Sequence, residues 1–288
     1  MPQSLPDSTH LGYVALTVSD LSRSVDFYTQ HVGLHLRDRT ATTARLGTSR
    51  RGFLELHEVA GATYIPQRTG LYHFAILVPT RLELAFALRN LIETSTQIQG
   101  FADHIVSEAI YLPDPDGNGI EIYCDRSRSN WYNPIGELQL DTLPLDVENL
   151  LIELNDQPRE WAGVGTDTTL GHVHLHVNRL PINEQFYRDV IGFDLMMRYG
   201  NSAAFMSAAR YHHHLGINTW AGHNAPPKPE GTVGLRWWEL ILPSDAVEAV
   251  AARAKASGEA ITPLDNGYEL RDPSQNAVRV VTEPFERV

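Results

Sequence analysis

An internal duplication constrains the fold of this chain more than any other feature of its sequence. Three segments of the first half match three segments of the second half. They are 19–36 with 178–195, 70–79 with 234–243, and 112–123 with 270–281. In the first pair, Phe27-Tyr28 falls on Phe186-Tyr187 without a gap. Each half of the chain therefore repeats the other, and each half contains two smaller units that are themselves alike.

Each of the four units is typical of a βαβββ module. It opens with a short run rich in Val, Ile and Leu, which predicts a strand, and continues with apolar residues at helical spacing. In the first unit Ser19 or Asp20 can cap the helix, and in the second unit Thr80 can do so. Two or three short strands then close the unit. The chain is therefore expected to be an α+β protein of four modules, at residues 9–66, 67–125, 168–222 and 231–284.

The four modules are expected to form two tandem domains, an N-terminal one at 9–125 and a C-terminal one at 168–284. A connector at 126–167 separates them, and it is expected to contain a short helix over Val147–Leu154 and to pack across both domains. The chain of 288 residues is long enough for each domain to bury its own core.

Composition and charge exclude several classes of protein. The net charge of −12 disfavours nucleic-acid binding, since the phosphate backbone would repel the chain. No apolar run approaches the roughly 20 residues of a membrane helix, and the N-terminus lacks the pattern of a signal peptide. The single cysteine, Cys124, excludes an internal disulfide framework. We therefore expect a cytoplasmic protein without a membrane or nucleic-acid partner.

Equivalent positions of the four modules carry the candidate metal ligands. The first position of the opening strand holds Tyr13, His73, His172 and Trp237 in turn, and the last strand of the even modules holds Glu121 and Arg279. Two histidines and one carboxylate are the ligand set of non-haem Fe(II) oxygenases. Only the pairing of module two with module three brings such a set together, as His73, Glu121 and His172.

Simpler interpretations of these residues stay open. A lone histidine on a strand is more often a hydrogen-bonded structural residue than a ligand. The segment Asp114-Pro115-Asp116-Gly117 looks like a calcium loop, but it lacks the downstream glutamate and is expected to be a plain turn.

Several segments in order resemble bacterial catechol 2,3-dioxygenases, the type I extradiol ring-cleaving enzymes of the vicinal oxygen chelate (glyoxalase–bleomycin resistance–dioxygenase) superfamily. The segments are GLYHFAILVP, SEAIYLPDPDGNGIEIY, GHVHLHV, FYRDVIGF and YHHHLGINTW. The resemblance implies two tandem vicinal oxygen chelate domains, a metal that is Fe(II) or Mn(II), and insertion of dioxygen into a catechol-type ring. Because Trp237 and Arg279 replace two ligands in the C-terminal half, the ligand set here lies across the two halves, unlike that of the better-known two-domain members.

The resemblance also implies roles for other residues. Tyr111, ten residues before Glu121, would hydrogen-bond the metal-bound substrate oxygen. The family also has a histidine before this tyrosine, and His104 is the candidate, although its spacing is shorter than the usual one. His213, in the run His213-His214-Leu215-Gly216, would be the acid–base residue, and His174 would line the substrate pocket. The alternative for the histidine run 212–214 is a solvated strand end or adventitious metal binding.

Two other classes of function compete with a dioxygenase. One is a glyoxalase-like metal-dependent isomerase or thiol transferase, which usually adds a carboxylate that residues 206–218 lack. The other is a metal-free small-molecule-binding protein of the antibiotic-sequestering kind. We expect a small aromatic substrate, catechol or a substituted catechol, together with dioxygen, and by analogy a homo-oligomer. The second half-site, with Tyr13, Trp237 and Arg279, is expected to be structural, with Arg279 bonded to a tyrosine hydroxyl or a carboxylate.

Overall fold

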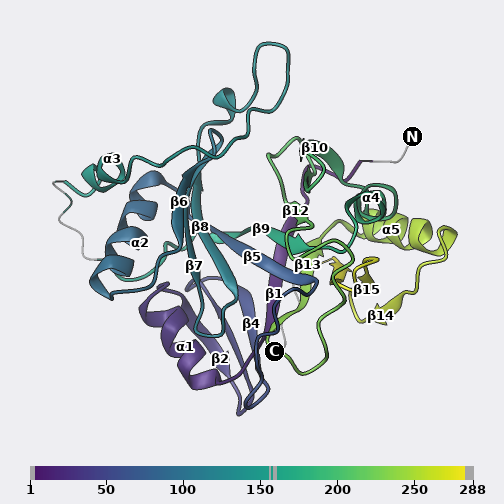
Figure 1. Cartoon of the computed structure of the whole chain (residues 1–288), viewed down its shortest axis with the longest axis horizontal. Helices are drawn as coiled ribbons and strands as arrows, with labels where there is room; N and C mark the ends of the chain where they lie inside the picture. Colours follow the sequence, from purple (N-terminus) through teal and green to yellow (C-terminus); the bar gives the residue numbers. More distant parts are fainter. Residues whose placement is uncertain (1–3, 156, 158–160, 283–288) are drawn as a thin grey trace. The chain divides into compact units, whose positions relative to one another are not determined.

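The computed structural model describes residues 4–155, 157 and 161–282 (Figure 1). Each of the four sequence units folds as a strand, a helical segment and three further strands, so the predicted α+β fold of four βαβββ modules is confirmed. Residues 1–3 of the N-terminus, residues 156 and 158–160 of the connector, and residues 283–284 of the last expected module lie outside the described residues.

The first two modules precede the connector. The first consists of β1 (His10–Val18), α1 (Leu21–Gln30), β2 (His35–Arg39), β3 (Thr43–Gly47) and β4 (Gly52–Glu58). The second consists of β5 (Gly70–Leu77), α2 (Arg81–Glu93), β6 (Gly100–Asp103), β7 (Ser107–Pro113) and β8 (Gly119–Asp125). The connector holds a 3-10 turn, η1 (Arg128–Asn130), and the helix α3 (Val147–Ile152). This helix begins at the predicted residue and ends two residues before the predicted end at Leu154.

The last two modules follow the same order. The third consists of β9 (Thr169–His176), α4 (Leu180–Gln185), the π-helical η2 (Phe186–Ile191), β10 (Asp194–Tyr199), β11 (Ala203–Ser207) and β12 (Leu215–Asn218). The fourth consists of β13 (Gly234–Ile241), α5 (Ser244–Ala256), β14 (Thr262–Leu264), β15 (Gly267–Arg271) and β16 (Ala277–Val281).

Local sequence signals explain where the helices begin and end. The side chain of Asp20 accepts a hydrogen bond from the backbone N–H of Arg23, and that of Thr80 accepts one from Glu83, so both predicted caps are present. Gly192, which falls on Gly33 in the matched segments 19–36 and 178–195, follows η2 with a φ of 104°. This left-handed conformation favours glycine and ends the helical turn.

The chain divides into two compact units. Unit one comprises the described residues within 1–17, 64–72 and 171–288, and unit two comprises those within 18–63 and 73–170. Unit one contains the strand orders β14-β15-β16-β13-β1 and β10-β11-β12-β9, and unit two contains β4-β3-β2 and β5-β8-β7-β6. The unit boundaries fall inside three strands: residues 70–72 of β5 belong to unit one, while residue 18 of β1 and residues 169–170 of β9 belong to unit two. The tandem domains expected at 9–125 and 168–284 stay a prediction.

In unit two, the strands β5 to β8 have one helix-covered face, with α2 lying along them (Figure 1). Phe74 and Ile76 of β5 are fully buried, and Phe74 packs near Tyr28 of α1. Because side chains alternate along a strand, His73 and Ala75 point to the opposite face. The fold therefore turns the histidine side of β5 away from the helices.

The Asp114 turn is a structural anchor, and the prediction of a plain turn is confirmed. The backbone N–H of Gly117 bonds to the carbonyl of Asp114, while the Asp114 carboxylate accepts hydrogen bonds from Asn118 and from the hydroxyl of Tyr28 at 2.9 Å. Burial raises the pKa of Asp114 and that of Tyr28. The duplication repeats this arrangement in unit one with Asp272, Asn276 and Tyr187.

Among the described residues, no helix is both long and apolar enough to cross a membrane.

Candidate metal centre

Two of the three predicted ligands come from neighbouring strands of unit two. Strands β5 and β8 run parallel with Ala75 opposite Glu121, so His73 and Glu121 share one face of the sheet. The His73 Nε2 atom lies 3.0 Å from a Glu121 carboxylate oxygen. Both side chains are buried, with 6% and 2% of their residue surface exposed. A buried carboxylate requires a cation or hydrogen-bond donors, and His73 lies in position to contribute.

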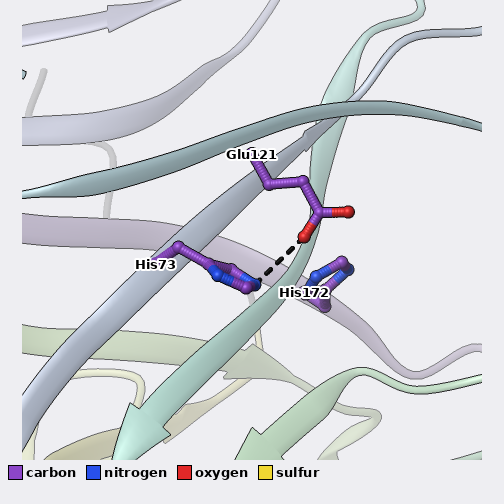
Figure 2. A group of neighbouring side chains, drawn as sticks. All are labelled: His73, Glu121 and His172. Atoms are coloured by element: carbon purple, nitrogen blue, oxygen red, sulfur yellow. Dashed lines mark ion pairs between the residues drawn. The ribbon is translucent and has the colours of Figure 1, made fainter. Parts of the chain in front are cut away.

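The third predicted ligand, His172, lies on β9 and is also buried. The atoms of His73, Glu121 and His172 that can bind a metal all lie within 4.8 Å of one another (Figure 2). Two imidazole nitrogens and one carboxylate oxygen fit a divalent transition metal, because this donor set leaves coordination positions open. The 3.0 Å between His73 and Glu121 also suits two adjacent ligands that are each about 2.1 Å from one metal.

Tyr111 and His104 form a hydrogen-bonded pair beside these ligands in unit two. Tyr111 lies directly opposite Glu121 in the β7–β8 register, and its ring centre is 5.6 Å from that of His73. His104 Nε2 lies 2.7 Å from the Tyr111 hydroxyl, and His104 Nδ1 lies 2.7 Å from the backbone carbonyl of Asp141. Because a carbonyl only accepts, Nδ1 carries a proton and a neutral His104 accepts the tyrosine proton at Nε2.

The backbone after His104 is strained. Ile105 has a φ of 69°, in the left-handed region that a β-branched residue rarely adopts. Its N–H bonds to the side chain of Asp103, and the N–H of His104 bonds to the carbonyl of Ser107. This turn between β6 and β7 explains how His104 reaches Tyr111 despite a sequence spacing that matches the family poorly.

The three consecutive histidines lie in the loop that enters β12 in unit one. They are all buried, with exposed fractions of 0%, 7% and 9%, so the alternative of a solvated strand end is wrong. The ring of His213 lies 4.1 Å from that of His172, against 6.3 Å for His212. His214 instead accepts a hydrogen bond from the backbone of Ala208. His213 is therefore the member of the run nearest to the candidate ligand His172.

His174 belongs to a polar network that the sequence did not reveal. Asn218 Oδ1 accepts the backbone N–H of Trp220 and lies 2.7 Å from Nδ1 of His176, so Asn218 Nδ2 is the group that faces His174 Nε2 at 2.9 Å. The amide must donate in that last contact, which makes His174 Nε2 an acceptor. The ring of Tyr72 lies 5.1 Å from those of both histidines. A signal for this network was present in the segment YHHHLGINTW, which contains both Asn218 and Trp220.

The equivalent positions in the other half of the duplication hold no ligand set. Tyr13 and Trp237 belong to one buried apolar cluster. The guanidinium of Arg279 lies 3.9 Å from the ring centre of Trp237 and donates a hydrogen bond to Glu269 at 2.9 Å. The expectation of a carboxylate partner for Arg279 is confirmed. The comparison of the internal repeats missed Glu239, a fully buried carboxylate that accepts a hydrogen bond from the backbone N–H of Tyr13.

Comparison with known proteins defines the class that this fold and site represent. The sequence profile of the Glyoxalase/Bleomycin resistance protein/Dioxygenase superfamily matches residues 10–122. A solved glyoxalase I variant from Zea mays has a TM-score of 0.61 and 18% identity, covering 95% of this chain and 94% of its own, which shows a shared fold. The protein is thus a duplicated glyoxalase-like α+β protein.

Sequence relatives narrow this class to a family. The catechol-2,3-dioxygenase of Bacillus subtilis (strain 168) is 45% identical over 280 residues, which is 95% of this chain and 97% of the relative. Biphenyl-2,3-diol 1,2-dioxygenase 3 of Rhodococcus globerulus is 28% identical over 123 residues, which is 40% of this chain and 64% of the relative. The chain belongs to the extradiol dioxygenases of this superfamily, in the catechol-2,3-dioxygenase family.

Proposed function

We propose that this chain cleaves the ring of a catechol-type aromatic with dioxygen, beside the two hydroxyl-bearing carbons, and that it uses Fe(II) or, less favourably, Mn(II). The observation that carries the proposal is the group formed by His73, Glu121 and His172, because it offers the oxygenase ligand set in a chain 45% identical to a catechol-2,3-dioxygenase. The homo-oligomeric state and the cytoplasmic location stay predictions.

The metal, when bound, would lower the pKa of the catechol hydroxyls and activate dioxygen. The two histidines would hold it as neutral imidazoles, and Glu121 would supply one negative charge from a buried position. A site with three protein ligands would leave the metal open to the reactants, and the main contribution of the residues would be to hold the catechol and dioxygen close to each other.

Tyr111 and His104 would orient the catechol. The Tyr111 hydroxyl lies against His104 Nε2, so it can pass its own proton to His104 while it accepts a proton from a catechol hydroxyl. The backbone carbonyl of Asp141 fixes the His104 ring from its other side. This pair would therefore select a substrate that loses a hydroxyl proton on binding.

His213 would act as the acid–base residue. Its Nδ1 lies 2.8 Å from Nδ1 of His212, so proton exchange with the substrate would fall to Nε2. The ring contact with His172 keeps the imidazole beside a proposed ligand, within reach of a molecule held there.

Metal-loaded protein tests the proposal directly. The apo-protein is reconstituted anaerobically with Fe(II) or Mn(II), its metal content is measured, and oxygen uptake is followed with a panel of catechols. His73→Ala, His172→Ala and Glu121→Ala are each expected to lose most of the metal and nearly all oxygen uptake. His57→Ala is the control, because His57 is a histidine beside a carboxylate, 2.5 Å from Glu55, but it is only partly buried and is not one of the three proposed ligands.

Two outcomes would contradict the proposal. If one of the three variants keeps full metal content and turnover, that residue is not a ligand. If that variant is His73→Ala or Glu121→Ala, the contact between these two residues is structural. If the metal-loaded wild-type protein consumes no oxygen with any catechol, the proposed ring-cleavage reaction is wrong. Isomerase or transferase activity without oxygen uptake would then favour the glyoxalase-like alternative.

A further inference from the structure

A series of aromatic rings leads from His172 to the surface of unit one. The ring of His213 lies 4.1 Å from that of His172, and Phe205 lies 5.1 Å from His213. His174 follows at 5.6 Å from Phe205, and Trp220 at 5.4 Å from His174. We call the outer part of this series the ring cluster; it consists of Phe205, His174, His176, Trp220 and Tyr72.

The outermost rings are large, apolar and half exposed. Trp220 has 48% of its surface exposed and Tyr72 has 40%, although His174 directly beneath them is buried at 3%. Leaving such rings in water forgoes the stabilisation that burial would bring, about 25 cal/mol for each Å². Exposed aromatic rings in contact with a buried site are typical of surfaces that receive a ligand.

Hydrogen bonds rather than burial hold Trp220 in position. Its backbone N–H donates to Asn218 Oδ1 at 3.0 Å, and its indole N–H lies 3.3 Å from Ser202 Oγ. Asn218 is fully buried and also faces His174, so one amide fixes the His174 ring and the backbone that carries Trp220. The indole is therefore held in place before any ligand arrives, which lowers the entropy lost on binding.

Gly216 leaves the space that the His174 ring occupies. Gly216 lies opposite His174 in the β9–β12 register, and a Cβ atom at Gly216 would come within 2.8 Å of His174 Cγ and 2.9 Å of Cδ2. Contacts of that length do not occur, so any larger residue would push the imidazole out of its place. The sequence thus leaves space at one position so that a ring can lie over it.

We propose that the ring cluster binds an apolar, preferentially aromatic, substituent of the catechol and so determines substrate specificity. The inference rests on the proposed function, since it assumes that the catechol itself is held beside His172. The cluster offers ring faces and edges to stack on, which suits a phenyl or alkyl group better than a carboxylate. In a chain with a net charge of −12, an anionic substituent would also be repelled over a long range.

Steady-state kinetics with two substrates test this inference. Trp220→Ala and Tyr72→Ala are each expected to raise KM for phenyl-substituted catechol about tenfold, the effect of losing one aromatic contact of roughly 1.4 kcal/mol. The kcat for that substrate and the KM for unsubstituted catechol should change less than about twofold. Trp220→Phe should restore most of the affinity, and Tyr64→Ala serves as the control, because Tyr64 is also an exposed tyrosine but lies outside the ring cluster.

A binding measurement separates specificity from activity. Anaerobic metal-loaded protein is titrated with both catechols and followed by calorimetry, and Gly216→Ala is included because it displaces His174 without removing a ring. Weaker binding of the phenyl-substituted catechol alone supports the inference. Equal losses for both catechols, or a change only in the oligomeric state of the Trp220→Ala variant, would overturn it.

The failure of the proposed function gives a different result. A wild-type protein that consumes no oxygen with any catechol contradicts that function, and the titration alone then decides the inference. Equal affinity of the wild-type protein for phenyl-substituted and unsubstituted catechol would overturn it in that case.

Discussion

Asp272 is a fully buried carboxyl group that couples the stability of unit one to pH. Burial raises its pKa from 3.8 to about 6, although its carboxylate accepts hydrogen bonds from Asn276, from the hydroxyl of Tyr187 and from the backbone of Ser274. Between these two pKa values the native state binds more protons than the unfolded chain. The stabilisation is therefore complete below the unfolded pKa and is lost as the pH rises through about 6.

The rise of the Asp272 pKa from 3.8 to about 6 sets the size of this effect. Each pKa unit corresponds to about 1.4 kcal/mol, so the free energy of unfolding changes by about 3 kcal/mol over the whole window. More than half of this change falls below pH 5, where the folded carboxyl group is mostly protonated while the unfolded one is losing its proton. Between pH 5 and pH 7 the linkage relation leaves a loss of about 1 kcal/mol.

Urea unfolding of the metal-free protein at pH 5 and pH 7 measures the effect. Asp272→Asn removes the titrating group, so the stability of the wild-type protein relative to this variant is expected to be about 1 kcal/mol lower at pH 7 than at pH 5. Asp245→Asn, at an exposed position in the first turn of α5, is the control for a general charge effect. A difference that stays constant with pH, or that grows as the pH rises, would refute the reasoning.

Three further substitutions test other parts of the structure. Arg279→Gln should lower the free energy of unfolding by about 1–2 kcal/mol, because it removes a cation–π contact and an ion pair, yet the metal content per chain should not change; loss of metal would show that this half-site is functional. His213→Phe should keep the metal but turn over about 10²–10⁴ times more slowly, and normal single-turnover rates would remove His213 from the reaction. Gly33→Ala should destabilise the protein by about 1–3 kcal/mol in thermal unfolding, since Gly33 has a φ of 80° and its Cβ would lie 2.2 Å from the Trp161 ring. Gly61→Ala, with a φ of 73° and open space around it, isolates the backbone strain from this clash, so equal losses in the two variants would contradict the packing argument.

Most of the fold could be predicted from the internal repeats of the sequence. Matching segments implied the same strand–helix–strand order four times, and the caps Asp20 and Thr80 marked two helix starts. The exact bounds were less predictable, because tertiary contacts extend strands beyond their apolar runs. Strand β5, for example, begins at Gly70, three residues before His73, where the expected strand began.

The candidate ligands were found by comparing equivalent positions of the repeats. That comparison selects residues by chemistry at a given position, and it works for His73 and Glu121 because a β-strand alternates faces with a fixed period. It missed Glu239, which falls on Ala75 in the matched segments 70–79 and 234–243, because only the first positions of the opening strands and the Glu121/Arg279 position were compared for ligands. It also could not choose among His212, His213 and His214. The choice depends on how a loop folds back toward β9, a matter of long-range packing.

The sequence by itself determined the class of fold, the residue types at the metal-binding positions and the loss of ligands in the half-site with Arg279. These properties follow from periodicity and composition, which local segments already contain. Only the tertiary structure decided that Ile105 adopts a strained turn to bring His104 to Tyr111, and that Asn218 orients His174 and Trp220 together. The physical reason is that hydrogen bonds and ring contacts between distant residues depend on atomic positions, and a linear pattern of residue types does not contain these.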